Sequence, residues 1–129
     1  QDVARLIRLK HPNKVLVTGE DRFLGYSLMC GAEAALIGMA SACVEVQSSF
    51  LKSYWNGDYR RFLDLNPVID DLAQHTFVDP MEGYIQRMLR CLVREGVIPP
   101  GSAHDPWGPS LPRADLDRLD VCLNRILRD

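Results

Sequence analysis

The spacing of hydrophobic residues changes along the chain and predicts two kinds of structure. Short apolar runs at 14–18 and 35–39 are typical of buried strands, and helical patterns occupy 2–10 and 20–30. Strands that alternate with helices at this spacing pair in parallel through crossover helices. The first part of the chain is therefore predicted to be an α/β segment. Two strands alone leave open edges, so further strands are expected to cover them.

The later apolar residues recur every three or four positions, which predicts helices alone. We expect a helix over 44–55, and then a turn in which Gly57 ends this helix and Asp58 caps the next. Another helix is expected from 80 to 95, and the proline-rich segment 99–112 is expected to be a loop. The last helix carries one apolar stripe, formed by Leu116, Leu119, Leu123, Ile126 and Leu127.

Composition and charge exclude several classes of protein. The chain has 129 residues, 25% of them charged, and a formal net charge of −2 without a basic cluster. Nucleic acid is not expected as a partner, because phosphate binding requires a concentrated basic face. No apolar run reaches the roughly 18 residues of a membrane span, and segment 1–10 is too charged for a signal peptide. We therefore expect a cytoplasmic protein without a membrane partner.

The residues that commonly bind metals are scattered along the sequence. The four cysteines lie far apart inside apolar segments and lack the CxxC spacing of metal sites. His75 and His104 have no partner at ligand spacing. The sequence therefore predicts no metal site and no cofactor, and it favours buried thiols in a reducing compartment. The cysteines are Cys30, Cys43, Cys91 and Cys122.

Five segments stand in an order and spacing that are similar to one enzyme family. Residues 15–21 end an apolar run in Gly-Glu-Asp, and residues 31–38 form a second segment of small residues, Gly-Ala-Glu-Ala-Ala-Leu-Ile-Gly. The turn at 56–59, Phe-Val-Asp-Pro at 77–80 and the proline-rich 98–112 follow. Together they resemble the family of dihydrodipicolinate synthase and N-acetylneuraminate lyase, which are class I, Schiff-base aldolases and dehydratases. The resemblance covers essentially the whole chain.

The resemblance implies an α/β fold, namely the C-terminal portion of a (β/α)8 TIM barrel. Strands seven and eight and the end of the barrel would lie in 1–56, and a C-terminal helical extension in 57–129. It also implies a lyase (an aldolase, dehydratase or synthase) that acts on a small 2-keto acid such as pyruvate through a lysine Schiff base. Such an enzyme is expected to be a homo-oligomer and to require the rest of the barrel. A non-catalytic relative or a helical interaction module is the alternative.

No lysine in this chain fits the catalytic role that the resemblance implies. A Schiff-base lysine must be desolvated or crowded by charge so that a neutral amine exists near neutral pH. Lys10, Lys14 and Lys52 are expected to be solvated on helices or at a strand start. The lysine is therefore expected before Gln1, where the chain begins inside a predicted helix. We expect a fragment or a processed chain that is inactive by itself.

Three positions match substrate-binding positions of the family, namely Gly19, Leu36 and Ser41. Gly19 either lets a substrate approach the backbone at a strand end or acts as a turn glycine. Leu36 matches a position whose carbonyl faces the lysine, and Ser41 stands where the family often has Asn. Glu20 and Asp21 match residues that bind sugar-acid hydroxyls, although capping of the next helix is the favoured interpretation. The substrate and the reaction direction stay open.

Overall fold

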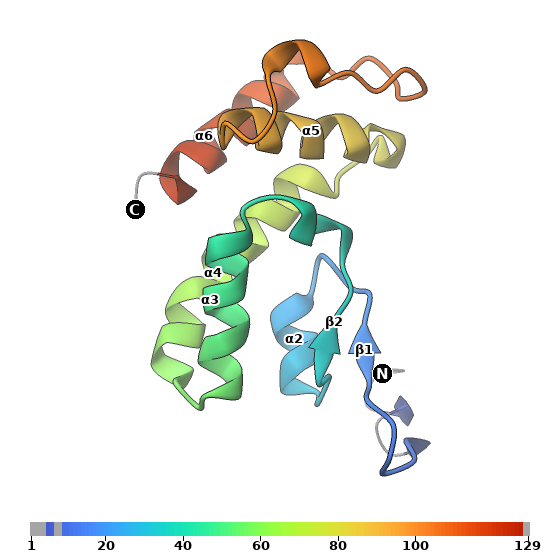
Figure 1. Ribbon diagram of the computed structural model, residues 1–129, viewed down its shortest axis with the longest axis vertical. Helices are drawn as coiled ribbons and strands as arrows, with labels where there is room; N and C mark the ends of the chain where they lie inside the picture. The colour runs from blue at the N-terminus through green and yellow to red at the C-terminus, as the bar shows by residue number, and fades with distance from the viewer. Residues whose placement is uncertain (1–4, 7–8, 128–129) are drawn as a thin grey trace. The chain divides into compact units, whose positions relative to one another are not determined.

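A computed structural model describes residues 5, 6 and 9–127, and helices make up most of it (Figure 1). The described chain divides into two compact units, with the boundary between Gly38 and Met39. The predicted domains, 1–56 and 57–129, divide the sequence at a different place. The helix expected over 2–10 lies largely outside the described residues. The two units are described separately below.

The first unit contains two short parallel strands joined by a helix. Strand β1 (Val17–Thr18) pairs with strand β2 (Ala34–Ala35), and helix α2 (Leu24–Met29) connects them. Gly31 follows the end of α2 with φ of +106°, a conformation that glycine accepts without a side-chain clash. The helix expected over 20–30 is therefore present in a shorter form, and it ends at the predicted glycine.

The predicted fold class, the C-terminal portion of a TIM barrel with strands seven and eight, was wrong. The strand expected over 14–18 shortens to Val17–Thr18, and the strand observed at Ala34–Ala35 shares only Ala35 with the one expected over 35–39. Gly38–Ser41 forms a 3-10 turn instead. Within the described residues, no third strand pairs with β1 or β2. A parallel pair without neighbours has two open edges, and its residues cannot be buried on both faces. Val15 is consequently 63% exposed and Val17 49%.

Within residues 39–127, four α-helices form the second unit, and they lie where the hydrophobic spacing predicted helices. The helix predicted over 44–55 is confirmed at both ends, and the helix predicted over 80–95 is confirmed except for its first turn, which is a 3-10 turn. The helices are α3 (Val44–Trp55), α4 (Tyr59–Thr76), α5 (Tyr84–Arg94) and α6 (Arg113–Ile126).

The predicted turn between α3 and α4 is confirmed in its details. Gly57 has φ of +74°, where a side chain would be strained, and it follows the end of α3. The Asp58 side chain accepts a hydrogen bond from the backbone N–H of Arg61 at 3.1 Å, which satisfies an otherwise unpaired donor of the first turn of α4. Gly96 ends α5 in the same way, also with φ of +74°.

Helix α4 is central to the second unit. It packs against α3 and α6, and α6 also packs against α5 (Figure 1). Phe50 of α3 stacks on Phe62 of α4, with ring centroids 4.7 Å apart and an interplanar angle of 18°. Leu119 and Leu123 of α6 are fully buried, so the centre of the predicted apolar stripe faces the interior of this unit. Burial of each such leucine contributes roughly 1.5–3 kcal/mol to folding.

Two further expectations concern membranes and thiols. Among the described residues, no helix combines the length and the apolar character needed to cross a bilayer. All four cysteines are free thiols, and Cys43, Cys91 and Cys122 are buried, as expected. Cys30 is partly exposed and departs from that expectation.

Candidate functional site

Two of the three predicted substrate-binding positions, Gly19 and Leu36, lie next to each other in the first unit. Each directly follows the last residue of its strand, so both stand at the C-terminal ends of the parallel pair. The Leu36 N–H donates a hydrogen bond to the Thr18 carbonyl at 2.8 Å. The Leu36 carbonyl oxygen lies 3.8 Å from the point where a Cβ on Gly19 would stand. We call this pair the strand-end edge.

The strand-end edge is open to solvent. Gly19 is exposed, and Leu36 is 81% exposed. Because Gly19 has no side chain, nothing at that position covers the Leu36 carbonyl. This exposure is compatible with both interpretations of Gly19, as a place of substrate approach and as a turn glycine.

The other predicted site residues are placed differently. Ser41 is exposed in the 3-10 turn at the start of the second unit. The Glu20 carboxylate accepts a hydrogen bond from the Arg22 backbone N–H at 3.0 Å, in the turn before α2. The N-cap of α2 is Phe23, which makes no side-chain capping bond. Glu20 therefore stabilises a turn, and it does not cap the helix as predicted.

None of the lysines has the surroundings of an imine-forming amine. Lys10 forms an ion pair with the Glu33 carboxylate, which also lowers the pKa of Glu33. Lys14 and Lys52 are exposed to solvent. An imine-forming lysine is instead desolvated or crowded by other positive charges. The expectation that these three lysines are solvated is confirmed for Lys14 and Lys52, while Lys10 is half-buried in its ion pair.

A second group of reactive side chains lies in the second unit, where sequence reasoning did not expect one. Asp71 and His75 stand one turn apart on α4, and Cys122 faces them from α6. One potential ligand atom from each residue lies within 4.8 Å of those of the other two. The His75 Nδ1 atom lies 2.7 Å from the Asp71 backbone carbonyl and 3.4 Å from its carboxylate. We call these three residues the Asp-His-Cys cluster.

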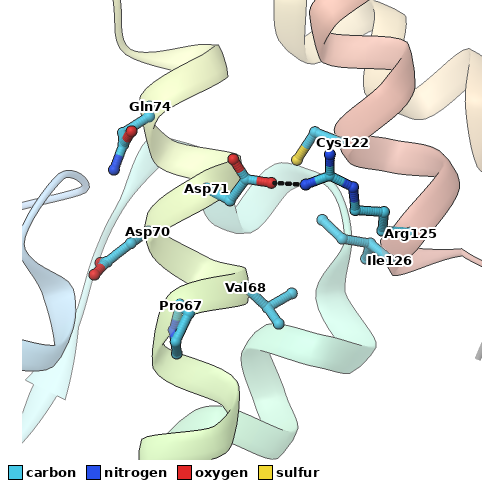
Figure 2. A pocket seen from close by; sticks show the side chains of 8 residues that line it. All are labelled: Pro67, Val68, Asp70, Asp71, Gln74, Cys122, Arg125 and Ile126. Carbon is cyan, nitrogen blue, oxygen red and sulfur yellow. Dashed lines mark hydrogen bonds and ion pairs between the residues drawn. The ribbon is translucent and has the colours of Figure 1, made fainter.

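Members of the Asp-His-Cys cluster line two cavities between α4 and α6. The larger has a volume of about 530 Å³ and is lined by Asp71 and Cys122 but not by His75. Figure 2 shows its lining, with the Cys122 sulfur and the Asp71 carboxylate pointing toward each other and Arg125 reaching Asp71. Arg125 Nη1 lies 3.3 Å from Asp71 Oδ2. The smaller cavity, of about 330 Å³, is lined by all three cluster residues and by Asp117, Arg118, Val121 and Arg125.

The electrostatics of the cluster keep the Cys122 thiol protonated. Burial, and next the nearby Asp71 carboxylate, raise the pKa of Cys122 to about 12. Both effects penalise a thiolate, because a buried anion loses its hydration and is repelled by a second anion. Cys122 is therefore not an activated nucleophile in this state, despite the neighbouring histidine. A change in the local charge, such as a bound cation, is required to stabilise its thiolate.

The cluster could have been anticipated only in part. Asp71 and His75 are four residues apart, a spacing that brings two side chains to the same face of a helix. His75 therefore has a candidate partner within its own helix, contrary to the prediction. Cys122 comes from another helix far along the chain, and no local signal links it to α4. The packing of α4 against α6 brings the three together.

Comparison with known proteins identifies no relative of this chain. It matches no known protein family, and neither a curated protein nor a solved structure is significantly similar to it. The proposals below consequently rest on the residues themselves and, for the first of them, on the resemblance described in the sequence analysis.

Proposed function

We propose that the chain contributes part of the pocket of a lyase that acts on a 2-keto acid such as pyruvate through a lysine Schiff base. The observation that carries the proposal is the strand-end edge. Gly19 and Leu36 match two substrate-contacting positions of the dihydrodipicolinate synthase-like enzymes that the sequence resembles, and they are adjacent and open to solvent. The proposal rests on this local arrangement of the backbone.

The chemistry assigns separate roles to this chain and to the lysine. A neutral lysine amine adds to the keto carbon to give a carbinolamine, which takes up a proton from solvent and loses water; the iminium ion so formed acidifies the adjacent C–H bonds. The Leu36 carbonyl, a fixed acceptor, would orient the amine through its N–H, and Gly19 would allow the substrate to approach. Because Lys10 is ion-paired and Lys14 and Lys52 are solvated, the proposal places the reacting lysine outside these 129 residues.

The proposal also includes the cellular compartment and the assembly. Four free cysteines support a reducing compartment such as the cytoplasm, where thiols stay unpaired. A homo-oligomer remains part of the proposal, and any contacts between subunits must use exposed faces of the helices. The centre of the apolar stripe of α6 is not accessible to another subunit, because Leu119 and Leu123 are buried in the core of the second unit.

A helical interaction module is the second candidate. The four-helix second unit contains most of the described residues, and it keeps large apolar side chains exposed on α4, α5 and α6. Exposed apolar side chains gathered in one patch would mark a protein-binding surface. Such a module would have no activity toward 2-keto acids, so an activity measurement separates the two candidates.

The test compares Gly19→Ala and Gly19→Val in the native protein that carries these residues. The readout is exchange of the pyruvate methyl protons with deuterated water, followed by NMR, because an iminium intermediate accelerates this exchange. The position tolerates a Cβ, since its nearest neighbour would lie at an ordinary contact distance. We expect melting temperatures within a few degrees of the parent. We expect exchange to fall modestly for the alanine variant and at least ~100-fold for the valine variant.

Two outcomes contradict the proposal. Absence of exchange in the parent protein would favour the interaction module. If Gly19→Val lowers both the exchange rate and the melting temperature, Gly19 is a turn glycine that stabilises the fold and does not contact the substrate.

A further inference from the structure

The Asp-His-Cys cluster combines three kinds of donor that bind transition metals, on two helices that pack together. Among the described residues it is the one group of at least three such side chains with ligand atoms close enough to share an ion. Asp71 and His75 come from the same face of α4, and Cys122 is held in place by burial on α6. Its members are therefore positioned by the helical core and not by a mobile loop.

We propose that Asp71, His75 and Cys122 form a binding site for a divalent transition-metal cation, with zinc as the best fit. A carboxylate, an imidazole and a thiolate are all zinc ligands, whereas calcium and magnesium prefer oxygen donors alone. Zinc bonds of about 2.0–2.3 Å bring neighbouring ligand atoms to within roughly 3.3–3.8 Å of each other. The 4.8 Å limit on the separations in the cluster leaves only a small inward movement.

The site would have three protein ligands and room for a fourth. All three residues line the cavity of about 330 Å³, which is large enough for water or a small anion at the open position. Three protein ligands with one exchangeable position are typical of catalytic zinc sites, and purely structural sites usually have four protein ligands. This inference is independent of the proposed lyase function, which concerns residues of the other unit.

Arg125 competes with a cation for the same carboxylate. Its guanidinium lies 3.3 Å from Asp71 Oδ2, and its side chain is 71% exposed. An exposed arginine can rotate into solvent at little cost, because ion pairs on a protein surface contribute little to stability. A bound dication would repel Arg125 and take its place beside Asp71. Removing the arginine should therefore strengthen metal binding, whereas removing any ligand should weaken it.

The experiment titrates the chain with Co²⁺, a spectroscopic substitute for zinc, under reducing conditions. Coordination by a thiolate produces a charge-transfer band in the near ultraviolet, and tetrahedral coordination gives intense visible bands. We expect both, and we expect Zn²⁺ to displace Co²⁺ and abolish them. Zinc should also raise the melting temperature, since a ligand that binds the folded state stabilises it.

Ligand variants with matched controls locate the site. Cys122→Ser should eliminate the charge-transfer band, whereas Cys30→Ser, which changes the partly exposed thiol of the other unit, should retain it. His75→Gln should weaken Co²⁺ binding by roughly 100-fold or more, because even the loss of an outer-shell partner costs 10–100-fold. His104→Gln, in an exposed loop, should leave affinity unchanged. Since His75 is partly exposed, its variant remains informative if Cys122→Ser does not fold.

A competing-charge variant completes the test. Arg125→Gln should bind Co²⁺ more tightly, by several-fold, and Arg113→Gln at the exposed start of α6 should not. The proposal is overturned if the parent chain gives no cobalt spectrum. It is equally overturned if the charge-transfer band survives Cys122→Ser, disappears with Cys30→Ser, or if His75→Gln and His104→Gln bind alike.

Discussion

Arg87 shows how one buried charge organises a loop. Its side chain is almost fully buried, and its guanidinium donates hydrogen bonds to the backbone carbonyls of Val78, Asp79 and Pro80 at 2.7–3.3 Å. Burial lowers the pKa of Arg87, while Asp115 and Asp79 oppose that shift. The three carbonyls replace much of the hydration that the guanidinium loses. Arg87 therefore fixes the segment between α4 and α5.

Replacing Arg87 should destabilise the chain substantially. Arg87→Leu retains apolar bulk but removes a donor from three carbonyls, of which the Pro80 carbonyl keeps the Gly83 N–H at 3.0 Å, so we expect the free energy of unfolding to fall by about 2–4 kcal/mol. Urea denaturation monitored by circular dichroism measures this change. The matched control is Arg113→Leu, because Arg113 is exposed and makes only a long contact with Asp117; it should change stability by less than ~0.5 kcal/mol. Similar effects of the two substitutions would show that the buried hydrogen bonds are unimportant.

At the same scale, local chemistry was predictable from sequence, and contacts between distant residues were not. Gly57 and Asp58 act within one turn of the chain, and both have their predicted roles. The family resemblance implied that Gly19 and Leu36 are substrate-binding positions, and the pairing of the two strands places these residues next to each other. The meeting of Cys122 with Asp71 depends on how two helices pack, which no local pattern specifies. The buried role of Arg87 is of the same kind.

At the scale of elements, the helical period was a more dependable signal than the apolar runs. The helices α3 to α6 follow from apolar residues three and four positions apart, repeated over several turns, with turn residues between them. A five-residue apolar run is ambiguous, because it becomes a strand only where neighbours supply hydrogen bonds and cover. Two residues of the run at 14–18 pair, Val17 and Thr18, whereas Ala35 is the one residue of the run at 35–39 that pairs in the described structure.

The stripe of α6 gives a prediction at this scale. Leu123 is 0% exposed and Val121 is 53% exposed on the same helix. Leu123→Asp buries a carboxylate in the apolar core, so we expect destabilisation by more than ~4 kcal/mol and loss of the cooperative thermal transition. Val121→Asp should keep the fold and nearly the same melting temperature.

Light scattering and a thermal melt distinguish the role of the buried face of α6, which carries Leu123, from that of its exposed face, which carries Val121. If α6 contributes to a homo-oligomer, Val121→Asp should give a smaller but folded assembly. A folded Leu123→Asp variant that merely dissociates would place Leu123 at a subunit contact and contradict its burial within the chain.

At the scale of the whole molecule, the two compact units carry separate functional proposals. The strand-end edge belongs to residues 1–38, and the Asp-His-Cys cluster belongs to residues 39–129. The cobalt titration can therefore succeed or fail independently of the activity toward 2-keto acids. With a formal net charge of −2, the chain as a whole lacks the strong positive charge that would favour a nucleic-acid partner over a small molecule.

The most direct test of the proposed lyase chemistry is reductive trapping. The native protein that carries these residues is treated with borohydride in the presence of pyruvate and then mapped by peptide mass spectrometry. The account predicts a reduced pyruvate adduct on one lysine outside the 129 residues, and no adduct when this chain is treated by itself. An adduct on Lys10, Lys14 or Lys52, or no adduct anywhere, would contradict it.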